Sequence, residues 1–88
     1  MTRHKLNRNE FRLGNGATVN IEYWTDATKV HVAAFGADGH QISLATYQAA
    51  VDSADNLSPE LQESLINSLA NALEYELMNN PELHVRKR

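Results

Sequence analysis

Histidine is the residue of this chain best suited to proton transfer or metal binding, and its spacing is informative. The chain has four histidines and no cysteine, so disulfides, thiolate metal sites and thiol nucleophiles are excluded. No two histidines stand three or four residues apart, and the HExxH pattern that puts two ligands on one helical face is absent. We therefore expect no metal site and no cofactor. The histidines are His4, His31, His40 and His84.

Acidic and hydroxyl groups that could act in catalysis lack the surroundings that catalysis needs. Two pairs of acids, Glu60 with Glu63 and Glu74 with Glu76, fall on a predicted helix among polar neighbours, whereas acid catalysis needs a carboxyl group shifted by burial or by a neighbour. No Walker or GxSxG motif occurs. The chain is thus expected not to be an enzyme, although an active site built between two subunits would leave no mark in a single sequence.

Charge is distributed unevenly along the chain. The formal net charge is −3, yet the stretch from Leu13 to Pro81 holds one basic residue, Lys29, against nine acidic ones, a net charge of −8. An acidic body attracts cationic protein surfaces and repels phosphate. The basic residues gather near the termini, where they could neutralise nucleic-acid phosphates in a salt-dependent way. Both groups of charges would also keep a small domain in solution. The terminal cations are Arg3, Lys5, Arg8, Arg12, Arg86, Lys87 and Arg88.

Alternation of apolar and polar residues predicts an antiparallel sheet in the first half of the chain. Residues 17–24 and 29–35 each alternate with period two, as side chains on a strand do. Asp38-Gly39 is a strong hairpin signal, and it predicts a third strand over residues 40–44. Phe11 to Leu13 would add a fourth strand at one edge. Gly14-Asn15-Gly16 is a turn signal because glycine and asparagine tolerate positive φ.

Helical periodicity begins after the predicted sheet. Spacings of three and four residues together with several alanines predict a short helix over about 45–54. A longer helix over about 59–78 is predicted from Ser58-Pro59-Glu60, which supplies an N-cap, a proline in the first turn and an acid near the positive end of the dipole. Its apolar stripe has a spacing of four, and Ile66, Ala70 and Ala72 widen it. The stripe consists of Leu61, Leu65, Leu69, Leu73 and Leu77.

These elements predict a single α+β domain spanning residues 1–88, with the long helix covering the apolar face of the sheet in a two-layer sandwich. The polar basic segments 1–9 and 82–88 would be extensions, and could be flexible. Without a second helix, the other sheet face would display an aromatic patch of the kind that binds a partner. The predicted partner-binding residues are Trp24, His31, Phe35 and Glu22.

The function expected from these patterns is protein–protein interaction without catalysis. By analogy of size and charge, the chain would be an accessory, regulatory or inhibitory protein of bacterial or phage type. The alternative is a nucleic-acid-associated protein that uses Arg3, Lys5, Arg8, Arg86, Lys87 and Arg88. A symmetric homodimer is also expected, because a three-stranded sheet leaves edges to cover. No stretch of roughly 20 apolar residues and no apolar leader occur, so we expect a cytoplasmic protein that does not enter a membrane.

Overall fold

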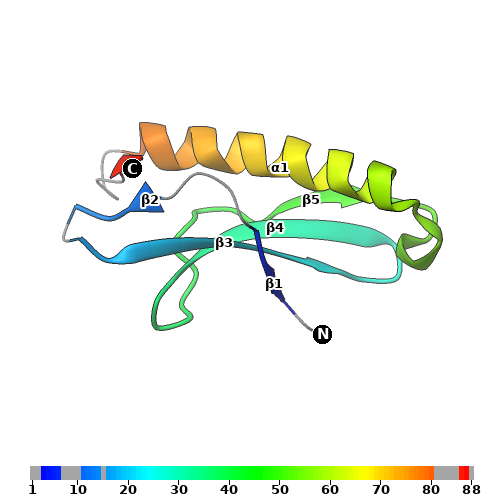
Figure 1. Ribbon diagram of the computed structural model, residues 1–88, viewed down its shortest axis with the longest axis horizontal. Coiled ribbons are helices and arrows are strands. Elements are labelled where there is room, and N and C mark those ends of the chain that lie inside the picture. Colours follow the sequence, from blue (N-terminus) through cyan, green and yellow to red (C-terminus); the bar gives the residue numbers. More distant parts are fainter. Residues whose placement is uncertain (1–2, 7–10, 15, 81–85, 88) are drawn as a thin grey trace.

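An antiparallel sheet covered on one face by a single long helix forms the architecture of the computed structural model (Figure 1). The structure describes residues 3–6, 11–14, 16–80 and 86–87. The strand order in the sheet is β5-β4-β3-β2-β6, and β1 pairs with β3. The elements are β1 (His4–Lys5), β2 (Phe11–Arg12), β3 (Thr18–Thr25), β4 (Lys29–Gly36), β5 (Tyr47–Ala50), the 3₁₀ turn η1 (Ala54–Asn56), α1 (Pro59–Asn79) and β6 (Arg86–Lys87).

The two strands with the clearest alternation form the centre of the sheet. β3 and β4 pair over seven residues from Val19 opposite Gly36 to Thr25 opposite Val30, which confirms the strands predicted over 17–24 and 29–35. β2 confirms a strand near Phe11 and pairs with the start of β3, but it is not the edge that was predicted, because β6 pairs with its other side. The apolar residues of β3 and β4 on one side, Val19 and Ile21 among them, are buried beneath α1.

The third strand of the predicted sheet lies later in the chain than residues 40–44. Residues 40–44 do not form a strand: after the Asp38-Gly39 turn they make one bridge, between Gln41 and Phe35. Regular pairing with β4 resumes at Tyr47 opposite Val32. Two residues of β4 therefore face five residues of the returning chain, and the connection bulges out and projects away from α1 in Figure 1. The hairpin turn was predicted correctly and the strand after it was not.

Ser43 fills the gap that this bulge leaves in the hydrogen-bond ladder. Its buried hydroxyl accepts a hydrogen bond from the backbone N–H of Ala34 at 3.2 Å and donates one to the carbonyl of Ala45 at 2.9 Å. An ordinary strand would offer a backbone carbonyl to Ala34 at this position. The side chain therefore substitutes for the missing backbone partner of the Ala34 N–H, which is buried and needs an acceptor.

The short helix predicted over about 45–54 is wrong. Tyr47 to Ala50 is strand β5, and only a 3₁₀ turn follows at Ala54–Asn56. The alanines at 45, 49 and 50 favour a helix in isolation, but the open edge of β4 offers a ladder of backbone partners that an isolated peptide lacks. Tertiary pairing overrides local propensity here.

Helix α1 begins and ends close to the predicted residues. The Ser58 hydroxyl caps it by accepting a hydrogen bond from the N–H of Leu61 at 3.2 Å, and Pro59 occupies the first helical position. Asn80, the residue before Pro81, has extended backbone and ends the helix. No helix among the described residues is long and apolar enough to cross a bilayer.

The buried line of α1 is narrower than the leucine pattern predicted. The predicted stripe repeats every four residues from Leu61 to Leu77. A step of four residues turns an α-helix by about 400°, so the stripe drifts by about 40° at each step and by roughly 160° over its length. One sheet face cannot contact both ends of it, and Leu61 is 50% exposed. The residues that α1 buries are Ile66, Ala70, Leu73 and Leu77.

Candidate interaction surface

The sheet face that α1 does not cover, called here the helix-free face, carries the residues predicted to bind a partner. Strand alternation brings them to one side, and the β3–β4 register sets them next to each other. Trp24 lies opposite His31, Glu22 opposite Ala33, and Asn20 opposite Phe35. The four predicted residues are therefore neighbours on two paired strands, as the sequence indicated.

A stack of rings organises this face. The Trp24 and His31 rings lie parallel, with centroids 5.2 Å apart and an interplanar angle of 10°. Trp24 also meets Phe35 at 6.1 Å in a tilted arrangement. The His31 Nε2 atom lies 2.6 Å from a carboxylate oxygen of Asp26, in the turn that joins β3 to β4. The carboxylate fixes the imidazole ring, and the imidazole ring supports the indole, so Trp24 is held in one orientation.

Arg3 extends the stack at the opposite end. Its guanidinium lies 4.1 Å from the centroid of the Phe35 ring, a cation–π geometry, and its Nε atom lies 3.6 Å from a Glu22 oxygen. Strand β1 places it there, because Lys5 pairs opposite Glu22 on β3. Sequence reasoning assigned Arg3 to a terminal basic cluster and did not predict this contact. Asp26 was also missed, although its position across a tight turn from His31 was a usable signal.

The aromatic patch is less exposed than expected. His31 and Phe35 are only 8% and 5% exposed, because Trp24 stacks on the first and Arg3 lies over the second. Trp24 and Glu22 are half-buried, and Arg3 is exposed. Trp24, Arg3 and Glu22 thus form an accessible part of this face that rests on the buried rings of His31 and Phe35.

The helix-free face includes one histidine–carboxylate pair, His31 with Asp26. A histidine–carboxylate pair such as His31–Asp26 orients a general base, but a catalytic site adds a nucleophile within hydrogen-bond reach. No serine or threonine hydroxyl bonds to the His31 ring among the hydrogen bonds of the described residues. Nor do three His, Asp or Glu side chains gather within that part of the chain to hold a metal ion. The His31 ring of this pair stacks on Trp24.

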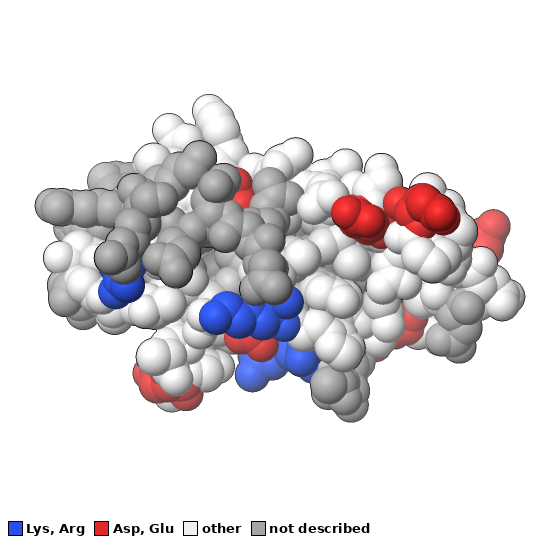
Figure 2. All heavy atoms as spheres, in the orientation of Figure 1, with Lys and Arg blue, Asp and Glu red and all other residues white. Residues whose placement is uncertain are grey.

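The basic residues near the C-terminus lie beside β2 at one end of the sheet, whereas those near the N-terminus lie further along β3. β6 pairs with β2 so that Arg86 lies opposite Arg12 and Lys87 opposite Phe11. β1 adds Lys5 on the adjoining part of β3. Figure 2 shows basic side chains near β1, while acidic side chains gather at the end of the molecule where α1 begins. Arg8 and Arg88, also predicted to bind nucleic acid, lie outside the described residues.

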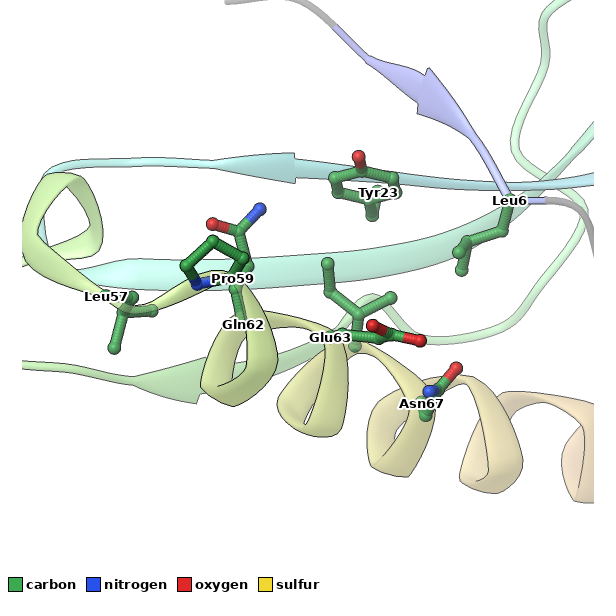
Figure 3. A pocket seen from close by; sticks show the side chains of 8 residues that line it. Leu6, Tyr23, Leu57, Pro59, Gln62, Glu63 and Asn67 are labelled. Atoms are coloured by element: carbon green, nitrogen blue, oxygen red, sulfur yellow. The ribbon is translucent and has the colours of Figure 1, made fainter.

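A groove of about 430 Å³ runs between the start of α1 and the sheet (Figure 3). Leu6 and Tyr23 line one side, and Gln62, Glu63 and Asn67 of α1 line the other. Its polar groups are amides, a phenol and one carboxylate, with no cation among its described lining residues. We take the Trp24 surface as the candidate site because it holds the residues predicted to bind a partner. Comparison of the chain with models of protein families, with curated proteins and with solved structures found no match.

Proposed function

We propose that this chain is a non-catalytic protein-interaction module that binds its partner through the accessible surface of Trp24, Arg3 and Glu22. The observation that carries the proposal is the fixed, half-buried indole over the His31–Asp26 pair. Tryptophan and arginine are the residue types that dominate binding energy at protein interfaces. A side chain already held in one rotamer loses little entropy on binding, which favours affinity.

The charge of the body indicates the kind of partner. The acidic stretch from Leu13 to Pro81 would steer a cationic protein surface toward the module and repel competing polyanions. This combination suits an accessory, regulatory or inhibitory protein of bacterial or phage type that occupies a basic groove on its target. Affinity for such a partner should fall as salt screens the long-range attraction.

Replacement of Trp24 by alanine tests the proposal. Binding partners captured from the native host by the tagged wild-type chain would be compared quantitatively with those captured by Trp24→Ala and by Tyr75→Ala. Tyr75 is an aromatic residue on α1, 73% exposed and remote from the helix-free face, so it serves as the matched control. We expect a protein partner retained by Tyr75→Ala and reduced at least tenfold by Trp24→Ala. Equal retention by both variants would contradict the proposal.

A second candidate function, nucleic-acid binding, draws support from the β2–β6 pairing. That pairing puts Arg12 and Arg86 on neighbouring strands although 74 positions of sequence separate them. Clustered cations release counterions from a nucleic-acid backbone, and the resulting affinity falls steeply with salt.

The two candidate functions are separated by fluorescence anisotropy on labelled DNA and RNA at about 50 and 200 mM salt. If the second function holds, binding at low salt weakens in the double variant Arg86→Ala/Lys87→Ala and is unchanged in Lys29→Ala, whose lysine lies at the other end of the sheet. Absence of binding by the wild type at the lower salt removes this candidate.

A further inference from the structure

A groove lies along the free edge of the sheet, on the face that α1 covers. Its volume is about 650 Å³, and it runs between strand β5 and the first turns of the helix. Leu61 and Leu65 line it from the helix. The other lining residues come from β5 and the connection to α1: Ala50, Val51, Asp52, Ser53, Asn56 and Leu57. Leu61 and Leu65 belong to the part of the predicted stripe that drifts off the sheet. The drift thus produces a second apolar line on α1, one that the sheet does not cover.

Strand β5 ends the sheet at this groove. No strand pairs with its outer edge among the described residues. The N–H of Val51 donates to the carbonyl of Thr28 at 2.8 Å, and alternate residues of an antiparallel strand point the same way. Tyr47 and Ala49 therefore direct their backbone groups toward β4, whereas Gln48 and Ala50 direct theirs outward. The outer edge offers two donors and two acceptors in ladder spacing.

The helical wall of this groove is free of charge over three turns. The acids of the first turns of α1, Glu60 and Glu63, lie on the other flank of the helix when positions are counted at 100° per residue. Glu76, further along on the groove side, is engaged by the backbone N–H of Leu44 and the hydroxyl of Tyr47. The uncharged flank of α1 on this side consists of Leu61, Ser64, Leu65, Ser68, Leu69 and Ala72, of which Leu61 and Leu65 line the groove.

We propose that a second copy of this chain docks here and forms a two-fold symmetric dimer through β5 and the leucine flank of α1. A two-fold axis at Ala49, perpendicular to the sheet, pairs Gln48 of each copy with Ala50 of the other. The outward donors and acceptors then satisfy one another, and the two sheets become one. Because the axis is perpendicular to the sheet, both α1 helices lie on the same face.

The spacing of the elements fits this arrangement. α1 packs over both β4 and β5 (Figure 1), so its axis lies about half a strand spacing inside β5. With strands roughly 4.8 Å apart, the two helices would be separated by about 10 Å. Helices in contact pack at roughly 8 to 10 Å. The leucine flanks would therefore meet across the axis without any change in either copy.

Charge and shape favour a second copy over another partner. A body with a net charge of −8 between Leu13 and Pro81 repels a copy of itself unless like charges are kept apart at the contact. The leucine flank of α1 supplies three uncharged turns, and in the proposed register Asp52, which lines the groove, lies opposite Thr46 of the other copy and not opposite the second Asp52. An isologous interface requires a surface complementary to itself, which an open antiparallel edge centred on a small residue provides. Both Trp24 surfaces remain accessible on the opposite face of the joined sheet, so this inference does not depend on the proposed function.

Sedimentation equilibrium of the full chain, 9.9 kDa as a monomer, tests the proposal. We expect a dimer whose dissociation constant rises more than tenfold in Leu61→Glu and is unchanged in Met78→Glu. Leu61 and Met78 are each 50% exposed on α1, but Met78 lies on the other flank. Circular dichroism would establish that both variants are folded. A wild-type chain that sediments as a monomer at submillimolar concentration overturns the proposal. The expected occupant of the groove would then be an extended peptide of another protein.

The backbone contribution is tested separately at Gln48. Proline at this position removes only an outward N–H and leaves the pairing with β4 intact. Gln48→Pro should weaken the dimer more than tenfold, whereas Gln48→Ala, which keeps the N–H, should not. A dimer equally stable in both variants would contradict pairing through β5.

A disulfide tests the register of the two strands. The chain has no cysteine, so Ala49→Cys introduces a single thiol at the proposed axis. Opposed residues of a non-hydrogen-bonded pair lie about 4.5 Å apart at Cα, within the range a disulfide spans. Mild oxidation should yield a covalent dimer of Ala49→Cys and little of Ala37→Cys, in the exposed hairpin turn. If the Ala49→Cys variant dimerises but does not cross-link, the two-fold axis at this residue is overturned.

Discussion

The hydroxyl of Ser43 shows how a single side chain can stand in for backbone. Where β4 lacks a strand partner, Ser43 accepts from Ala34 and donates to Ala45. A buried N–H without an acceptor costs more than a typical hydrogen bond contributes, because its hydration is lost without compensation. The bulge is therefore compatible with a stable β4 only while this oxygen is present.

Replacing Ser43 by alanine should lower the free energy of unfolding by about 1 to 3 kcal/mol. The measurement is urea denaturation followed by circular dichroism. Glu63→Ala is the control, since Glu63 is exposed on the flank of α1 away from β5, and its effect should stay within about 0.5 kcal/mol. A loss for Ser43→Ala no larger than for the control would show that water or another group satisfies the Ala34 N–H.

The sequence predicted on which sheet face the aromatic residues lie, but it did not predict which groups bury them. Alternation correctly brought Trp24, His31 and Phe35 to one face, since period two is a property of the extended chain. Their burial depends on Arg3, which reaches Phe35 only because β1 pairs with β3. A two-residue strand of polar residues carries no apolar periodicity, so neither that pairing nor its consequence could be predicted.

Helix α1 is joined to the returning chain by a carboxylate. Glu76, expected among solvated acids, accepts hydrogen bonds from the Tyr47 hydroxyl at 2.8 Å and from the N–H of Leu44 at 3.0 Å. Burial raises the pKa of Tyr47 above its ordinary value of 10.0, and the hydrogen bond to Glu76 raises it further. The link therefore depends on the phenol remaining protonated.

Alkaline conditions should weaken this link. Well below pH 10 both the folded and the unfolded chain keep the phenolic proton, so the contribution of Tyr47 is complete. Above about pH 10 the unfolded chain releases the proton and the folded chain retains it, so the free energy of unfolding falls until pH passes the raised folded pKa. Urea titrations should show the stability difference between wild type and Tyr47→Phe shrinking as the pH rises above about 9. A constant difference would contradict the raised pKa.

Elements with strong internal signals were predicted well, and those defined by their neighbours were not. α1 carries its own cap and proline, and β3 and β4 carry their own alternation. β5 has the composition of a helix, Tyr-Gln-Ala-Ala, and becomes a strand because β4 has an open edge. The leucine stripe was assigned entirely to the core because its four-residue spacing was taken as one face, whereas helical drift divides it between two.

The described part of the molecule has a hydrophobic core shared by β2, β3, β4 and α1. The helix-free face lies outside that core, yet its ring stack rests on the same two strands. Loss of β3–β4 pairing would therefore disrupt the hydrophobic core and the ring stack together. Folding of the two faces is therefore expected to be a single cooperative event.

The chain contains one tryptophan, Trp24, so its emission reports on the helix-free face, while far-ultraviolet circular dichroism reports mainly on α1. In urea, at one protein concentration, both signals should give the same midpoint and the same slope. Fluorescence changing at lower urea than the helical signal would show that the ring stack opens independently, and the fixed orientation of Trp24 in the proposed function would lose its basis.

The turn between β4 and the bulge has a practical consequence for engineering. Residues 37–41 are exposed, and a 2.9 Å hydrogen bond between the Gly36 N–H and the His40 carbonyl closes the turn at its base. Sequence inserted at such a tip starts and finishes at points that the scaffold already holds together. The domain could thus display a grafted epitope or accept a second folded unit there, while both the indole surface and the β5 edge stay unobstructed.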